Sequence, residues 1–205
     1  MARDRSPIVK QSRREGVALA PKAYKVMARK TGIPGQHAQG RRGRSSLYLT
    51  QLREKQKVRR MYGLLEKQFA RTMKEAEKGV GMAGEKLLVL LERRLDNVIF
   101  RAGFATTRRG SRQLVSHGNF LLNGKRVDIP SIRVKVGDEI TVRPKSQKNG
   151  YFKALPEIVK DAAVQKSGWL SVNVPKMTVK VTGLPARTDI VEDINEQLIV
   201  EYYSR

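Results

Sequence analysis

The side chains of this chain that could do chemistry are mostly arginines, and one group of them falls on one face of a short helical pattern. The pattern begins at Thr107, a residue type that caps helices, and ends near Gly118. Residues three and four apart share a face of a helix. That face carries Arg108, Arg109, Arg112 and Gln113. Such a face favours binding of phosphates, and it lacks the acid and base pair that an active site needs.

A β-hairpin is expected directly after this helix. Asn123 and Gly124 accept the positive backbone angles of a type I′ turn, and they lie in the middle of residues 121–127. Lys125 and Arg126 follow the turn. The apolar residues on the other side of the helix can pack on the hairpin, which predicts a compact module with an apolar back and a cationic front.

The charge of the chain narrows the class of partner. Its 205 residues contain 42 Lys or Arg and 19 Asp or Glu, a net charge of +23. Residues 1–45 contain 12 basic and 2 acidic residues, and residues 101–153 contain 12 and 3. Residues 187–205 contain 2 basic and 5 acidic residues, so this end is expected to have a different role. Such an excess of positive charge predicts a polyanionic partner, and nucleic acid is the expected one.

Several other classes of protein are disfavoured. No apolar run approaches the roughly 20 residues of a spanning helix, so no membrane partner is expected. The first residues lack the apolar core of a signal peptide. The chain has no cysteine, which excludes disulfides and thiol catalysis and is compatible with a cytoplasmic protein.

Hydrophobic periodicity gives a coarse reading of the elements. Residues 1–45 show no sustained apolar period, which predicts a basic arm that becomes ordered on RNA. Three amphipathic helical patterns then follow, and their apolar positions are interpreted as core. Alternating residues after the hairpin predict short strands, and the acidic end predicts a short helix leading into an extended segment. The helical patterns lie at 49–61, 64–73 and 85–99, with a further one near 154–165, and the strand patterns at 132–136, 140–142, 169–174 and 178–181.

Several segments together resemble one family. Residues 91–101 (LERRLDNVIFR), 105–107 (ATT) and 111–115 (SRQLV) are similar to the sequence signature of bacterial small-subunit ribosomal protein four. The same family has segments similar to residues 12–16, 34–37, 51–57 and 195–201, in the same order along the chain. The resemblance therefore runs from end to end.

The resemblance implies an α+β fold in which a small RNA-binding domain is inserted into a helical domain. The expected parts are a basic extended N-terminal arm at 1–45, and a small helical domain at 46–95 that about 183–205 completes. The third part is an inserted helix–hairpin RNA-binding domain with a small mixed sheet at 96–182.

The resemblance also implies a function. It predicts a structural ribosomal protein of the cytoplasmic small subunit that binds ribosomal RNA directly at a multi-helix junction and nucleates the subunit body. It further implies a contact with ribosomal protein five that helps to set translational accuracy, and contacts with other small-subunit proteins. Messenger RNA, where it enters the ribosome, is a further possible partner of Arg44, Arg53, Lys57 and Arg60.

The candidate binding residues follow from charge and from this resemblance. The RNA-binding candidates are Arg3, Arg5, Lys10, Arg13, Arg14, Arg41, Arg42, Arg44, Arg53, Lys57, Arg60, Arg108, Arg109, Arg112, Asn123, Lys125 and Arg126. The candidates for protein contact are Glu192, Glu196, Glu201 and Tyr202. No cofactor is expected. Many relatives hold zinc with four cysteines near the N-terminus, but this chain has none and resembles the zinc-free branch.

Two other functions are left open. Pseudouridine synthases share the small RNA-binding domain, and their catalytic aspartate follows an Arg-Leu pair, as Asp96 follows Arg94 and Leu95 here. The rest of the enzyme motif and a domain of catalytic size are missing, so Asp96 is interpreted as a helix-surface residue paired with a nearby arginine. The other function is regulatory, because some members of the family repress their own messenger RNA.

Overall fold

The chain folds into two compact units, and the first unit takes both ends of the chain. The structure is a computed structural model that describes residues 4–30, 32–36, 45–157, 168–190 and 192–205. The first unit comprises residues 1–87 and 192–205, and the second comprises residues 88–191. The second unit is therefore an insertion in the sequence of the first.

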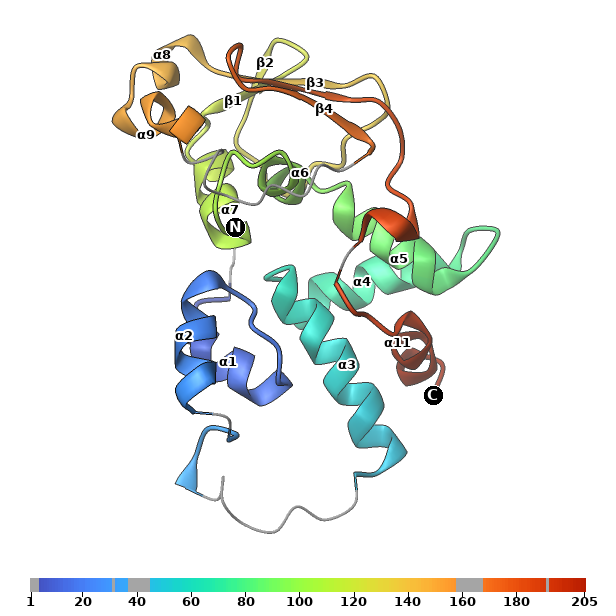
Figure 1. The fold of residues 1–205 in the computed structure, drawn as a ribbon. Coiled ribbons are helices and arrows are strands. Elements are labelled where there is room, and N and C mark those ends of the chain that lie inside the picture. Colours follow the sequence, from blue (N-terminus) through green and yellow to red (C-terminus); the bar gives the residue numbers. More distant parts are fainter. Residues whose placement is uncertain (1–3, 31, 37–44, 158–167, 191) are drawn as a thin grey trace. The chain divides into compact units, whose positions relative to one another are not determined.

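The first unit is helical (Figure 1). Its longest helix, α3, begins after Ser46, whose hydroxyl accepts a hydrogen bond from the amide of Leu49 at 3.2 Å. Gly63, with a φ of +64°, then turns the chain into the next helix. The helices are α1 (Ile8–Glu15), α2 (Pro21–Arg29), α3 (Leu47–Met61), α4 (Glu66–Glu77) and α11 (Glu196–Tyr203), and α5 (Ala83–Glu92) continues into the second unit.

The first 45 residues differ from the extended arm that the sequence predicted, because they contain α1 and α2. Their apolar stripe is sparse: α1 buries Ile8 together with the polar residues Gln11 and Ser12, and α2 buries only Ala23. The Ser12 hydroxyl donates to the carbonyl of Ile8 and accepts from the amide of Leu19. Buried hydrogen bonds thus take the place of apolar contacts, so hydrophobic periodicity missed both helices.

The C-terminal helix α11 packs against α3 through mixed polar and aromatic contacts. Gln51 donates a hydrogen bond to Glu201 at 2.8 Å, and the rings of Tyr48 and Tyr202 lie 5.8 Å apart. Ile199 is fully buried beneath them. The helix extends to Tyr203, so the extended segment predicted for this end is absent from residues 196–203.

Glu66 ties the C-terminal helix to the start of α4. It accepts hydrogen bonds from the ammonium of Lys55 at 2.6 Å and from the hydroxyl of Tyr203 at 2.9 Å. Burial alone raises the pKa of Glu66, but these two donors outweigh it and hold the pKa below its ordinary value. Burial and the hydrogen bond to Glu66 raise the pKa of Tyr203.

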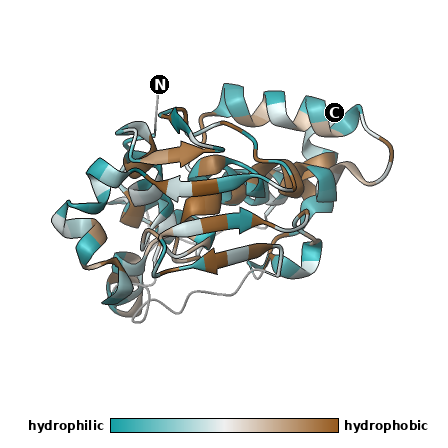
Figure 2. Cartoon of the chain, turned by 90° about the horizontal axis from the view of Figure 1, so that it is seen from above, coloured by the Kyte–Doolittle hydropathy of each residue, from teal (hydrophilic) through white to brown (hydrophobic). Residues whose placement is uncertain are grey.

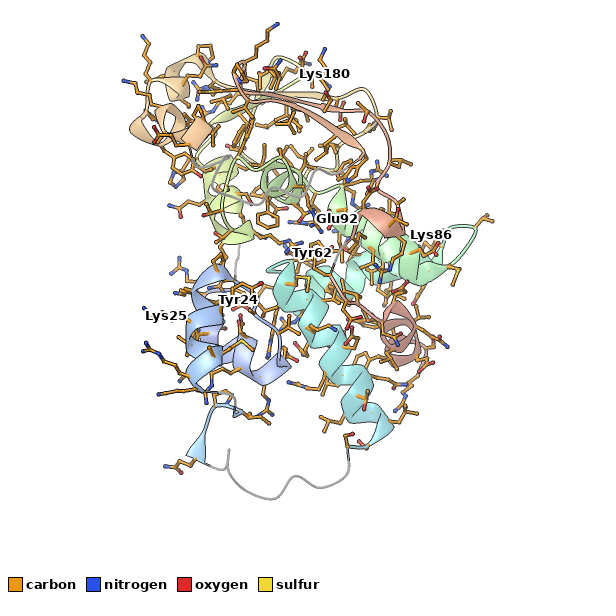
Figure 3. The ribbon with its side chains drawn as sticks, viewed as in Figure 1. Tyr24, Lys25, Tyr62, Lys86, Glu92 and Lys180 are labelled. Carbon is orange, nitrogen blue, oxygen red and sulfur yellow. The ribbon has the colours of Figure 1, made fainter. Side chains whose placement is uncertain are left out.

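The second unit contains a five-stranded sheet in the order β2-β1-β3-β5-β4, in which every neighbouring pair is antiparallel. Residues of contrasting hydropathy alternate along its strands (Figure 2). Lys180 lies on the side of the sheet away from α6 and α7 (Figure 3). The strands are β1 (Phe120–Leu122), β2 (Lys125–Val127), β3 (Glu139–Val142), β4 (Leu170–Asn173) and β5 (Thr178–Val181).

Two helices cover the other face of this sheet (Figure 1). Helices α6 (Leu95–Arg101) and α7 (Arg108–Ser116) bury Leu95, Val98, Ile99 and Val115 against Phe120 and the neighbouring strands. Short elements complete the unit: α8 (Pro144–Gln147), α9 (Gly150–Lys153) and a 3-10 turn, η2 (Arg187–Asp189). The α+β fold class is confirmed, but the sheet is antiparallel throughout and not the mixed sheet that was predicted.

The helix and hairpin predicted around the arginines are both confirmed. The Thr107 hydroxyl accepts a hydrogen bond from the amide of Gly110 at 3.0 Å and caps α7. Asn123 and Gly124 have φ angles of 50° and 80° and join β1 to β2. These are the positive angles that a type I′ turn requires.

Two elements of the second unit differ from the prediction. The helical pattern expected over 85–99 breaks at Arg94, which has an extended conformation between α5 and α6. The segment 132–136 forms no strand, and only an isolated bridge joins Arg133 to Arg94. Within this segment, the carbonyl of Ile132 accepts a hydrogen bond from the backbone amide of Leu95 at 2.8 Å, so the segment caps the start of α6. Most of the helix expected near 154–165 lies outside the described residues.

Candidate RNA interface

The cationic face of α7 is divided between exposed and anchored side chains. Arg109 and Gln113 are exposed, Arg108 is half-buried and Arg112 is buried. The helix therefore presents Arg109 to solvent, while Arg112 has only 9% of its surface exposed. The expectation that all of these side chains form one solvated front holds for only part of the face.

A buried carboxylate, Glu92, organises the base of this face (Figure 3). Its two oxygens accept hydrogen bonds from Nη2 and Nε of Arg101 at 2.8 and 2.9 Å. The side-chain nitrogen Nδ2 of Asn97 also donates to Glu92, at 2.7 Å, and the side-chain oxygen Oδ1 of Asn97 accepts from Nε of Arg108 at 2.9 Å. The Arg108 guanidinium lies 4.6 Å from the centre of the Phe100 ring. Arg108 is thus held from two sides at the N-terminus of α7.

A second buried carboxylate, Asp96, anchors Arg112. Nη1 of Arg112 lies 3.4 Å from Oδ2 of Asp96, and Nη2 of Arg94 lies 3.0 Å from the same oxygen. Asp96 is therefore paired with arginines as the sequence predicted, but it is buried and not on the helix surface. Charge-assisted hydrogen bonds of this kind let one aspartate position both guanidinium groups.

The hairpin contributes cations at the other end of α7. Lys125 and Arg126 are exposed, and the Arg126 guanidinium approaches Gly118 so closely that a Cβ atom there would lie 2.7 Å from its Nε. Arg143 donates to the carbonyl of Gly118 at 3.1 Å. Cations are favoured at the C-terminal end of a helix, where carbonyl groups concentrate partial negative charge.

Asn123 is a turn residue whose side chain is already engaged. Its amide donates to Asp138 at 2.9 Å, and its oxygen accepts from the amide of Glu139 at 2.9 Å. These bonds tie the tip of the hairpin to the start of β3. Its side chain thus has a structural role in the hairpin, and the RNA contact predicted for Asn123 stays a prediction.

In the first unit, Glu15 gathers two of the candidate arginines. Arg53 lies 3.2 Å from Oε1 of Glu15, and Arg60 pairs with the same oxygen. Glu15 is buried, and burial raises its pKa while both guanidinium groups oppose that rise. Arg53 and Arg60 thus join α3 to the end of α1. The sequence had predicted only an RNA contact for these two arginines.

The remaining candidates of the first unit fall into three groups. Arg5, Lys10 and Arg14 are exposed. Arg13 donates to the carbonyls of Gly32 and Ile33, and Lys57 pairs with Glu54 and donates to the carbonyl of Asp193. Four candidates lie outside the described residues, namely Arg3, Arg41, Arg42 and Arg44.

The four residues proposed for protein contact lie at the acidic end of the chain. Glu192, Glu196, Glu201 and Tyr202 are all partly exposed. Glu201 accepts a hydrogen bond from Gln51, and the ring of Tyr202 packs at a tilt against that of Tyr48. The side chain of Glu196 approaches α5 at Gly84, where a Cβ atom would lie 2.7 Å from the Cβ of Glu196. These residues therefore also hold α11 in place.

Sequence reasoning missed Glu92 and Arg101 as the centre of a network. Their separation of nine positions matches no helical period, because the chain breaks at Arg94. It also left out Arg59, which lies beside Lys10, Arg14 and Arg60. Arg59 directly precedes Arg60 in the sequence, so the run of basic residues in the α3 pattern could have drawn attention to it.

Other kinds of site find little support within the described residues. No three His, Asp or Glu side chains there lie close enough together to form a metal site. His117 is exposed at the end of α7. Within the same residues, the helices are too short or too polar to cross a membrane.

Comparison with known proteins agrees with this architecture. Residues 3–92 match the family model described as the ribosomal protein S4/S9 N-terminal domain, and residues 93–140 match that of the S4 domain. The fold, the basic face and these matches define an RNA-binding protein built on an S4 domain.

Relatives match over the whole length of the chain. Small ribosomal subunit protein uS4 of Chlorobium phaeovibrioides is 49% identical over 205 residues, and that of Clostridioides difficile is 50% identical over 211 residues. That of Roseiflexus sp. is 47% identical over 206 residues, and all three comparisons cover the whole of both chains. The chain therefore belongs to the family of small ribosomal subunit protein uS4, which is structural and not enzymatic. The predicted family and the absence of an enzymatic role are confirmed.

A matched pair of substitutions separates the exposed arginine of α7 from the anchored one. Arg109→Ala is expected to weaken RNA binding and to lower the salt slope of log affinity by about 0.7–0.9, the value for one phosphate contact. Arg112→Ala is expected to lower the free energy of unfolding by about 1–3 kcal/mol, because it removes a buried partner of Asp96. Denaturant unfolding and RNA titrations over a salt series measure both effects. An Arg109→Ala protein that unfolds more readily but binds RNA with an unchanged salt slope would contradict this division.

Proposed function

We propose that this protein binds small-subunit ribosomal RNA directly at a multi-helix junction, and that this binding nucleates assembly of the subunit body. The supporting observation is that one chain carries two separately folded basic surfaces. One lies on α7 and the hairpin, with Arg109, Lys125 and Arg126 exposed, and the other lies on the first unit, with Arg5, Lys10 and Arg14 exposed.

The chemistry of these surfaces suits structured RNA. The major groove of A-form RNA is too narrow for side chains, so proteins recognise its shape, its phosphates and its unstacked bases. Arginines on rigid helices fix a protein on phosphates and carry little sequence information. Two such surfaces joined in one chain bind cooperatively, because the first contact raises the effective concentration of the second. A junction, where several helices converge, offers phosphates to both surfaces at once.

The test of this proposal is footprinting of the purified protein on naked small-subunit ribosomal RNA. We expect protection of a multi-helix junction in the 5′ part of the RNA, and weaker protection throughout that footprint with the Arg109→Ala protein. Transfer RNA at equal concentration serves as the control. Preferential protection of transfer RNA would contradict the proposal and would favour the RNA-modifying class instead.

The acidic end of the chain is proposed to contact ribosomal protein five and thereby to influence translational accuracy. Residues 187–205 carry 5 acidic and 2 basic residues in a chain of net charge +23, so this end would be repelled by RNA. A basic partner is the complementary one, and charge at the rim of such a contact acts mainly on specificity and association rate. The proposed location is accordingly the small ribosomal subunit in the cytoplasm.

Messenger RNA is not included in this proposal. Of its four candidate contacts, Arg53 and Arg60 pair with Glu15, and Lys57 pairs with Glu54. Arg44 lies outside the described residues. The three described candidates therefore each have a carboxylate partner within the first unit.

Reversal of one exposed charge tests the role of the acidic end. Asp193 is exposed, and only its backbone carbonyl bonds to Lys57, so Asp193→Lys keeps that bond. We expect this variant to bind isolated ribosomal RNA with unchanged or slightly higher affinity and to raise readthrough of a stop-codon reporter in cells. Glu77→Lys, the same change on an exposed position of α4, is the control and should leave accuracy unaltered. Unchanged readthrough with the Asp193→Lys protein would contradict the proposed role of this end, and a large gain in RNA affinity would place it against RNA.

A further inference from the structure

A basic pocket in the first unit has the composition of a nucleotide site. Its volume is about 360 Å³, within the range of small-ligand pockets. It lies between α1, the start of α4, the loop at Pro34 and the C-terminal half of α3. Its lining consists of Asp4, Ser6, Pro7, Lys10, Gln11, Arg14, Pro34, Arg59, Arg60 and Leu65.

Three kinds of wall meet in this pocket. The cationic wall comprises Lys10, Arg14, Arg59 and Arg60, the apolar wall comprises two prolines and Leu65, and the polar wall centres on Asp4. An RNA nucleotide presents the same three chemistries, namely an anionic phosphate, flat apolar faces of the base and a hydrogen-bonding base edge. An acidic peptide would satisfy the cations but would leave the apolar wall unused and would meet Asp4 unfavourably.

The polar wall is preorganised. Oδ1 of Asp4 accepts from the amide of Ser6 at 2.8 Å, and Oδ2 accepts from the side-chain amide of Gln11, also at 2.8 Å. These two bonds orient the Asp4 carboxylate. A carboxylate accepts hydrogen bonds, so this wall is compatible with a base whose edge carries an amino group.

The cations differ in how firmly they are held. Arg60 pairs with Glu15, and Arg59 donates to Gln56 at 2.9 Å and to the carbonyl of Leu64 at 3.3 Å. Lys10 and Arg14 are exposed on α1. The pocket therefore has a fixed cationic floor and two long side chains at its rim that can close on a phosphate.

We propose that this pocket receives one unpaired nucleotide of ribosomal RNA, with its base among Pro7, Pro34 and Leu65 and its phosphate at Lys10 and Arg14. The inference rests on the proposed function, because it assumes that the first unit binds ribosomal RNA. It adds that this contact recognises an extruded base and is more than a contact with phosphates. Sequence-specific recognition of RNA commonly uses unstacked bases of this kind.

The first test fills the pocket without changing its charge. Ser6 lines the pocket and is exposed, and its backbone amide is the group that donates to Asp4, so Ser6→Trp occupies the space of a base and keeps that bond. Ala28→Trp, at an exposed position of α2 outside the pocket, is the matched control. Chemical probing of bases and 2′-hydroxyls in the RNA complex reports single nucleotides.

We expect the wild-type protein to protect one unpaired nucleotide that regains its reactivity with Ser6→Trp, while the rest of the footprint persists. Affinity should fall about tenfold, or about 1.4 kcal/mol, and Ala28→Trp should behave as wild type. A folded Ser6→Trp protein with the wild-type footprint and an affinity within about twofold of wild type would overturn the pocket assignment alone. Absence of any footprint with the wild-type protein would overturn the proposed function and the pocket together.

A second test addresses the phosphate and the source of the nucleotide. Lys10→Ala with Arg14→Ala should weaken RNA binding about tenfold more than Lys22→Ala with Lys25→Ala, which removes two exposed charges of the same unit on α2 (Figure 3). Equal losses in the two double variants would reduce the pocket to general electrostatics and contradict the proposal. Titration with AMP and GMP should give no saturation below millimolar concentration, and micromolar binding of either would identify a free nucleotide as the ligand instead.

Discussion

The arrangement of the RNA-binding unit depends on one buried ion pair, between Glu92 at the end of α5 and Arg101 at the end of α6. Side-chain exposure is 1% for Glu92 and 5% for Arg101, and two hydrogen bonds join them. Burying both charges has a desolvation cost that their attraction offsets only when the geometry is good. The same carboxylate holds Asn97, and Asn97 holds Arg108. The pair therefore fixes the position of the Arg108 guanidinium group on α7. Its main effect is to orient these side chains, and its net contribution to the free energy of unfolding is small.

A surface that binds a polyanion faces a conflict, because the cations it gathers repel one another. This protein reduces the repulsion by placing carboxylates beneath the cations. Asp96 lies under Arg112 and Arg94, and in the other unit Glu15 lies beside Arg53 and Arg60. The anchored arginines then serve as a scaffold, and the exposed cations, such as Arg109 and Lys125, lie at the surface of the unit. Counting arginines on a helix face thus overstates the number of phosphate contacts.

The local part of the fold was predictable from the sequence, and the long-range part was not. The cap at Thr107 and the turn at Asn123 and Gly124 depend on residues within a few positions of one another, and both are found. The prediction of a strand at 132–136 was wrong, because the carbonyl of Ile132 bonds to α6 and not to a neighbouring strand. The alternation of apolar and polar residues does not indicate which partner a backbone carbonyl will have. The helices of the first 45 residues were missed for a different reason. In α1, Ser12 and Gln11 are buried and hydrogen-bonded, so the segment shows no apolar period.

The same limit applies to the candidate site. Whether an arginine is exposed or anchored depends on a carboxylate distant in sequence, as Arg53 and Arg60 on α3 depend on Glu15 at the end of α1. The pocket beside α1 shows this most clearly, because its walls come from four separate segments between Asp4 and Leu65. The charge of each segment indicated an RNA partner, whereas the combination of cationic, apolar and acceptor groups emerges only from the fold.

The affinity of Glu92→Gln protein for ribosomal RNA tests the central claim most directly, because electrostatics alone and positioning predict opposite signs. Removing a negative charge from the protein would by itself strengthen binding to a polyanion. If Glu92 positions Arg108 through Asn97, the variant should instead bind about tenfold more weakly under conditions where circular dichroism shows it folded. Binding that is unchanged or tighter than that of the wild-type protein would contradict the account.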